Sequence, residues 1–169
     1  MTRCGRPMEM LVAATGVDGG VTNIQNVTGS NGNSMLVGDA SANVLLGGTG
    51  RNILIGDGGA DSITGGGGDN ILIGDSTIWD ANLTALQAIF AEWTRTDLSF
   101  EQRLAHLISE GNNDGRLNGS YVLNKKTVIS DGAIDTLLGG DSSALDWFFV
   151  TGKRDSYTPH NPRDHITQV

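Results

Sequence analysis

The chain has 169 residues, a length that predicts one domain of ordinary size. Its formal net charge of −8 disfavours nucleic acid and anionic membrane surfaces as partners and favours cations. Of the 19 acidic residues, 15 are aspartate, which favours turns, so most of the acid is expected in loops.

The first 19 residues contain no repeat and are expected to be irregular. Their apolar piece, Met10 to Ala14, is shorter than the core of a usual signal peptide, so no cleavable export signal is expected. Cys4 is the single cysteine, which excludes an internal disulfide and a cysteine-based zinc site. No apolar run approaches the ~20 residues that a membrane span needs.

Nine-residue units repeat along residues 20–78. After a looser first unit, GVTNIQNVT, they read GSNGNSMLV, GDASANVLL, GGTGRNILI, GDGGADSIT and GGGGDNILI. Each of these five has Gly first, Ser, Asn or Asp sixth, and Leu or Ile eighth. Six turn-forming residues followed by three of strand character predict short strands that stack into a parallel β-solenoid, or β-roll. The expected interior residues are Leu36, Leu45, Leu54, Ile63 and Leu72.

Because one coil of the solenoid takes two units, the loops fall on two edges. The loops that start at Gly38, Gly56 and Gly74 are expected along one edge, and those that start at Gly29, Gly47 and Gly65 along the other.

Residues 79–111 change to helical spacing of apolar residues. Asp80 or Asn82 can cap a first helix, and Ser99 with Gln102 forms a capping box for a second. We expect a helical hairpin, inserted in the solenoid or, more specifically, capping its open end.

Residues 112–150 are expected to form a β-hairpin over SYVLNKKTVIS, followed by returning repeat-like strands. In that return Asp131, Asp135 and Leu137 fall at repeat positions two, six and eight. Residues 151–169 are expected to be a polar tail. The fold class is therefore mainly β.

Stacked Gly/Asp loops bring carboxylates close together, which is repulsive unless a cation intervenes. Between Asn33 and Asp75 the only basic residue is Arg51, so protein cations are too few. Calcium fits this need, because it takes about six to eight oxygen ligands and accepts both carboxylates and backbone carbonyls.

The units GGTGRNILI, GDGGADSIT and GGGGDNILI resemble the RTX, or hemolysin-type, calcium-binding repeat GGxGxDxUx. The resemblance covers residues 29–77 and returns more weakly over 130–150. It implies several calcium ions between loops stacked on one edge, held by loop carbonyls and by the sixth-position side chains. By position these side chains are Asn43 and Asp61 on one edge, and Asn52 and Asn70 on the other.

Only Asp61 keeps the acid of the family motif in these units, so some sites are expected to be weak or empty. Three acids at the second position of their units lie on the same edge as Asp61: Asp39, Asp57 and Asp75. Asp69 lies on the other edge. We expect calcium on the edge of Asp61 and an asparagine ladder on the other edge. It remains open whether Asn52 and Asn70 bind calcium or only satisfy their turns.

A vaguer similarity links residues 80–149 to a C-terminal segment that follows such repeats in large bacterial surface proteins. It implies that the chain is the C-terminal fragment of a larger secreted or cell-surface protein.

The leading functional hypothesis is a module that folds on binding calcium outside the cell. The alternative is a small metal-dependent hydrolase of phosphate esters, either diesters or triesters, with an open metal site where the repeats end. Its candidate ligands, to which no catalytic roles are assigned, are Asp75 and Asp80 with Asp131, Asp135, Asp141 or Asp146. An adhesive module is a third reading, and an open solenoid end or edge predicts pairing of two chains.

Overall fold

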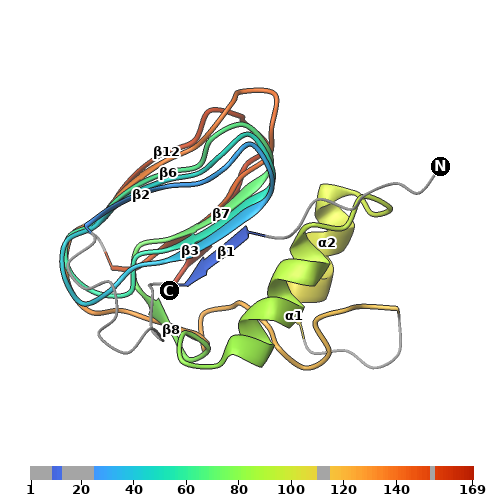
Figure 1. The fold of residues 1–169 in the computed structure, drawn as a ribbon, viewed down its shortest axis with the longest axis horizontal. Coiled ribbons are helices and arrows are strands. Elements are labelled where there is room, and N and C mark those ends of the chain that lie inside the picture. The colour runs from blue at the N-terminus through green and yellow to red at the C-terminus, as the bar shows by residue number, and fades with distance from the viewer. Residues whose placement is uncertain (1–8, 13–24, 110–114, 153–154) are drawn as a thin grey trace.

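The computed structural model describes residues 9–12, 25–109, 115–152 and 155–169. Two parallel sheets lie face to face and form a flattened roll, and a helical segment lies beside one of them (Figure 1). The first sheet has the order β1 (Glu9–Val12), β3 (Ser34–Val37), β5 (Asn52–Ile55), β7 (Asn70–Ile73), β11 (Trp147–Val150) and β13 (His165–Gln168). The second has the order β12 (Ser156–Thr158), β10 (Thr136–Leu138), β6 (Ser62–Thr64), β4 (Val44–Leu46) and β2 (Asn26–Thr28).

Strand register confirms that one coil takes two nine-residue units. Met35 pairs with Ile53, and Ile53 with Ile71, so residues of β3 and β5 pair with their equivalents two units further along the chain. The eighth residue of each unit points into the roll, and the predicted interior is confirmed. The interior cluster contains Leu36, Leu45, Leu54, Ile63, Leu72, Leu137, Phe148 and Val150.

The two sheets differ on their outer faces. Four strands of the first sheet are buried along their whole length: β3, β5, β7 and β11. In the second sheet only the middle residue of each strand is buried in β4, β6 and β10. The first sheet carries units that end in MLV, ILI or WFFV, and the second carries VLL, SIT and TLL. Threonine and serine account for part of the difference, whereas Val44 and Leu46 of β4 are apolar and exposed. A strand with large apolar residues on both faces needs cover on both faces.

The helical segment supplies that cover, and it interrupts a loop of the roll. Ile63 pairs with Leu45 on one side, two units earlier, but with the distant Leu137 on the other, so the coil between Ile63 and Leu137 contains a long insertion. If residues 76–131 are left out, the chain on either side reads GDGAIDTLL, which fits the unit GDGGADSIT. We call residues 76–131 the insertion.

The insertion leaves the roll on a short antiparallel stalk of β8 (Ser76–Thr77) and β9 (Val128–Ile129). It contains α1 (Leu83–Trp93), capped by Asn82, and α2 (Phe100–Ile108), whose capping box of Ser99 and Gln102 confirms the prediction.

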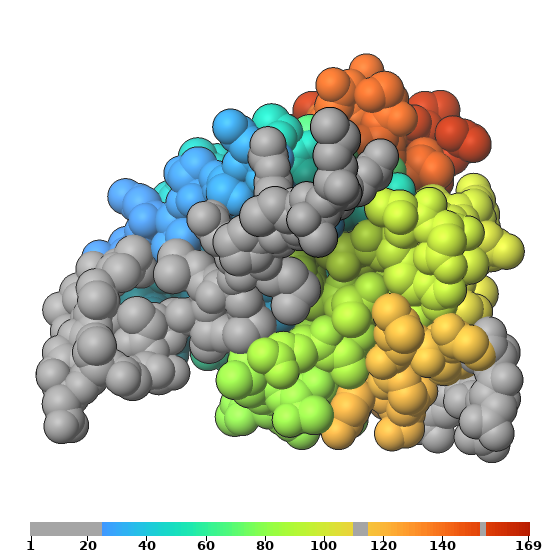
Figure 2. All heavy atoms as spheres, turned by 45° about the vertical axis from the view of Figure 1, so that its right-hand side comes forward, coloured from blue at the N-terminus to red at the C-terminus, as the bar shows by residue number. Residues whose placement is uncertain are grey.

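The helices pack on the outer face of the first sheet. Side chains of α1 and α2 form one buried cluster with the outward-facing residues of β3, β5, β7 and β11. Figure 2 shows the insertion, green through yellow to light orange, lying along the roll. The predicted helical hairpin therefore exists as an insertion, one of the two placements expected, and the other placement, as a cap on the open end, was wrong. Of the described helices, neither is long and apolar enough to cross a membrane.

Three other expectations need correction. The predicted hairpin over 120–130 is absent, since turns there lead to the two residues of β9. Residues 151–169 are not a tail, because β12 and β13 add a strand to each sheet. In the N-terminal segment that was expected to be irregular, β1 pairs with β3, and the rest of that segment lies outside the described residues.

Candidate metal centre

Sixth-position side chains build a hydrogen-bond ladder along each edge of the roll. After the first member of each ladder, every side chain accepts the backbone N–H of the sixth-position residue one coil earlier, which fixes the spacing of the stacked loops. One ladder, which we call the aspartate edge, contains Asn43, Asp61, Asp135 and Asp155. The other, the asparagine edge, contains Ser34, Asn52, Asn70, Asp146 and Asp164.

On the asparagine edge the amide groups fill the loops. Asn52 Nδ2 donates to Asn70 Oδ1 at 2.8 Å and to the carbonyl of Gly50 at 2.9 Å. Asn70 Nδ2 donates to Gly68 O at 2.5 Å and to Asp146 Oδ1 at 2.9 Å. A neutral donor thus lies among the carbonyls that would otherwise face a cation, as the expected asparagine ladder requires.

Asp69, also on the asparagine edge, is neutralised by arginine. Its Oδ2 accepts a hydrogen bond from Arg103 and lies 3.5 Å from Arg51 Nε. Arg103 is 1% exposed and stacks 4.7 Å from the ring centroid of Trp93. The sequence suggested Asp69 as a calcium ligand, but the structure gives it protein cations, one of them from the insertion.

On the aspartate edge, no ion pair between described residues provides such neutralisation. Asp61 and Asp135 are each at most 2% exposed, so water does not reach them freely. The Oδ2 atom of each nevertheless has no hydrogen-bond partner. In neighbouring loops the second-position N–H closes the turn, as between Asp39 N and Asn43 Oδ1 at 2.8 Å. In the loop of Asp61 the second-position residue, Asp57, has φ of 75°, a left-handed conformation that is uncommon outside glycine.

More carboxylates surround these two oxygens. Burial raises the pKa of Asp61 to about 7, against the opposing effect of the Asn43 N–H, and the charge of Asp135 adds to the rise. Burial likewise raises the pKa of Asp135 to about 6, with contributions from Asp75 and Asp155. Ion pairs among the described residues involve none of these acids.

This donor set fits calcium. Its oxygens are carboxylates and loop carbonyls, which a hard cation prefers, and a buried carboxylate oxygen without a donor needs a positive charge. Gly56 keeps the space open, because a Cβ there would collide with Asp61 Oδ2 and with the carbonyl oxygen of Gly74.

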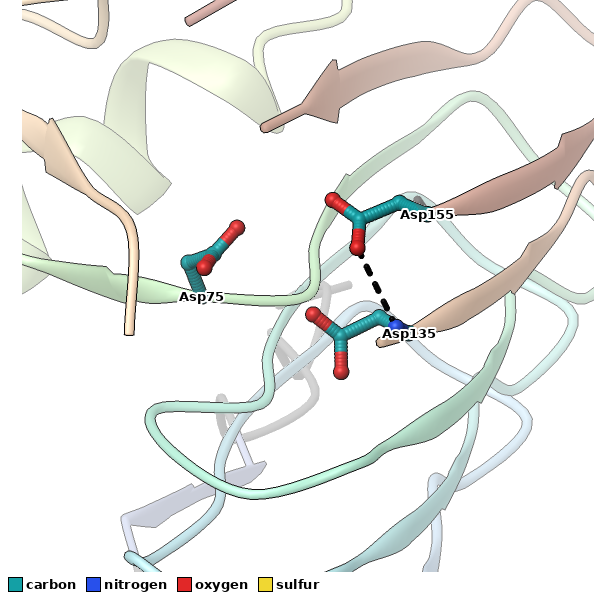
Figure 3. A group of neighbouring side chains, drawn as sticks. All are labelled: Asp75, Asp135 and Asp155. Atoms are coloured by element: carbon teal, nitrogen blue, oxygen red, sulfur yellow. Dashed lines mark hydrogen bonds between the residues drawn. The ribbon is translucent and has the colours of Figure 1, made fainter. Parts of the chain in front are cut away.

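The residues suggested for the hydrolase site divide between several places. Asp75 and Asp135 come together on the aspartate edge, beside Asp155 (Figure 3). Asp131 is exposed; its N–H donates to Asp75 Oδ1 at 3.0 Å, while its own Oδ2 accepts from Gly59 N at 2.7 Å. Asp80 instead accepts hydrogen bonds from Thr77 N at 2.6 Å and Thr77 Oγ1 at 2.5 Å, at the start of the insertion.

The remaining two lie elsewhere. Asp141 is exposed and accepts from Ser143 N at 2.9 Å, and Asp146 lies on the asparagine edge, where it accepts from Asn70 and Gly140.

Asp155 was missed by the sequence reasoning, although a signal exists. RDSYT and RDHIT, at 154–158 and 163–167, match ADSIT at 60–64 in the spacing of Asp, an apolar residue and Thr. These last units contain no glycine at the start of their loops, so a search led by glycine passes over them.

A family model described as the RTX calcium-binding nonapeptide repeat, in four copies, matches residues 20–54, 28–63 and 46–76. The curated proteins and the solved structures gave no match. Most of the insertion and the coils that follow it lie outside the matched residues. Residues 20–76 thus match the RTX nonapeptide repeat, a repeat that binds Ca²⁺, and the described residues among them, 25–76, fold as part of a parallel β-roll.

Proposed function

We propose that the chain is a structural module that folds and becomes stable when calcium binds its aspartate edge in the extracellular space. The observation that carries this proposal is the buried, unpartnered Oδ2 of Asp61 within the matched repeats. RTX repeats typically belong to secreted bacterial proteins, which agrees with action where calcium is abundant.

Calcium would act on the free energy of folding. Without it, the native roll must hold Asp61 and its neighbours close together in a buried setting, which favours protonation or unfolding. An ion that binds only the native loops stabilises the native state by its own binding free energy. Asp61 and the carbonyls of the loops at Gly56 and Gly74 would hold this ion, with Asp57 beside it.

Asp61→Asn tests the proposal. The Asn side chain keeps an oxygen for the N–H of Asn43, now 2.7 Å from Asp61 Oδ1, but removes the charge. We expect the variant to need at least tenfold more calcium to reach the same β content in far-UV circular dichroism. Asp164→Asn is the control, because Asp164 makes the same ladder bond to Asp146 N on the asparagine edge at 2.8 Å. Equal calcium dependence of the two variants would reject the assignment.

The hydrolase alternative gains no observation of its own. Asp80 and Asp146, two of its suggested ligands, are engaged in separate places. The acids that do converge are explained by calcium binding alone. Pairing of two chains through a roll end stays a prediction, which analytical ultracentrifugation in calcium would test.

A further inference from the structure

An open groove of about 430 Å³ crosses the asparagine edge of the roll. The loops of the repeats line it with residues at their third to fifth positions, among them Arg51 and Asp69. Thr94 and Thr96 line it from the end of α1 and the turn toward α2, and Ser143 from the coil after the insertion. The repeats, the insertion and the later coil therefore meet at this groove.

The hydroxyl groups of the groove are set to accept hydrogen bonds. Thr49 Oγ1 donates its proton to the carbonyl of Asn31 at 2.8 Å, and Thr94 Oγ1 donates to the carbonyl of Phe90 at 2.8 Å. A hydroxyl group has one proton and two lone pairs, so both oxygens can still accept from a ligand. These residues favour a ligand that carries hydroxyl donors of its own.

The charges in the groove favour an anionic group on that ligand. Arg51 and Asp69 are the charged residues of its lining. Asp69 Oδ1 accepts from Leu145 N at 3.0 Å, and its Oδ2 already accepts from Arg103. Arg51 Nε lies 3.5 Å from the same Oδ2, and Arg51 Nη1 donates to Arg95 O at 2.6 Å.

Two guanidinium groups thus share one carboxylate, and the three side chains of Arg51, Arg103 and Asp69 carry one net positive charge. The pKa of Arg103 reflects this excess, because burial lowers it and the charge of Arg51 lowers it further, against the opposing effect of Asp69.

We propose that the groove binds a small carboxylic acid that carries hydroxyl groups. Arg51 holds the carboxylate by a charge-assisted hydrogen bond, and the hydroxyls of Thr49 and Thr94 accept from those of the ligand. One net positive charge suits one carboxylate, and the net charge of −8 of the chain disfavours a polyanion. The volume lies within the range of roughly 300–1,000 Å³ that small-molecule sites occupy.

Gluconate and sorbitol are matched probes, because sorbitol has the same carbon chain with a hydroxyl group in place of the carboxylate. Saturation-transfer difference NMR on the whole chain in saturating calcium should show that gluconate binds and sorbitol does not.

Arg51→Met should raise the dissociation constant of gluconate at least about tenfold, since it removes the charged donor. Arg163→Met is the control, because it changes the net charge equally at an exposed residue outside the groove. This control should bind gluconate as the unaltered chain does.

Three results would overturn the proposal: no gluconate bound by the unaltered chain, sorbitol bound as well as gluconate, or equal gluconate binding by the two arginine variants. The last would also be seen if gluconate bound only to calcium ions of the protein. If Arg51→Met does not fold, Thr96→Trp decides in its place. Thr96 is exposed in the turn of the insertion, and an indole there should fill the groove and abolish gluconate binding. Any of these failures leaves the proposed function standing, because Asp61→Asn tests that function on the other edge.

Discussion

At the scale of the residue, the second polar atom of each sixth-position side chain decides the chemistry of its loop. The first atom does the same work everywhere, accepting an N–H from the previous coil, whether it belongs to Asn52, Asn70 or Asp61. An asparagine directs its NH₂ group to loop carbonyls, which completes a neutral turn. Asp61 leaves an oxygen unpaired, and this is the difference on which the proposed calcium site rests.

The raised pKa values predict an unusual pH dependence for the calcium-free protein. The folded-state pKa of Asp61 is about 7 and that of Asp135 about 6, both above the ordinary value of 3.8. Groups with a raised folded pKa contribute stability at low pH that is lost as pH rises through that pKa. In EDTA the melting temperature should therefore be higher at pH 5 than at pH 7.5.

Asp61→Asn isolates this effect. His165 opposes it, because burial lowers the pKa of its imidazole and favours the folded state at higher pH. His165 is present in both the unaltered chain and Asp61→Asn, so its contribution cancels when their melting temperatures in EDTA are compared. Between pH 5 and pH 7.5 the variant should lose less stability than the unaltered chain. A variant that keeps the full pH dependence would contradict the role given to Asp61. In calcium the trend should reverse, since protons compete with the ion.

At the scale of the element, the insertion does two things for the roll. Its helices cover the apolar outer face of the first sheet, and α2 brings Arg103 to the asparagine edge. There the guanidinium compensates Asp69, also donates to Trp93 O at 2.7 Å, and lies over the Trp93 ring. One edge of the roll is thus stabilised by the protein itself, and in our proposal the other is stabilised by calcium.

Arg103→Met should destabilise the protein without weakening calcium binding. Removing a buried cation leaves Asp69 without its main partner, and we expect a loss of about 3 kcal/mol in the free energy of unfolding. Arg51→Met is the comparison, since the Arg51 side chain is 28% exposed and its Nε lies 3.5 Å from Asp69 Oδ2. This variant should lose at most about 1 kcal/mol in the free energy of unfolding. Urea unfolding in saturating calcium measures both. Equal losses in the two variants would show that Arg103 has no special role.

At the scale of the whole molecule, the roll could be predicted from local sequence, but the place of the insertion could not. The nine-residue period fixes the strands, the two-unit coil and interior residues such as Leu54 and Ile63. The interrupted loop, however, is assembled from Gly74 and Asp75 and from residues 132–135, and neither piece alone shows the motif.

The parts of the site that were not predicted depend on contacts between distant segments. Asp155 reaches Asp75 only because the roll resumes after the insertion, and its glycine-free loop hides the repeat. Asp69 has the sequence signature of a ligand, and only the packing of α2 on the roll brings Arg103 to it. Tertiary packing therefore decides which acids receive a protein cation and which are left for the proposed calcium.

The most direct test of a calcium-stabilised roll is the thermal unfolding of the unaltered chain, followed by far-UV circular dichroism in EDTA and in a series of calcium concentrations. Because the ion binds the native loops, the account predicts a low melting temperature or no cooperative transition in EDTA, and a melting temperature that rises steadily with calcium concentration. The same cooperative transition at the same temperature in EDTA and in millimolar calcium would contradict it.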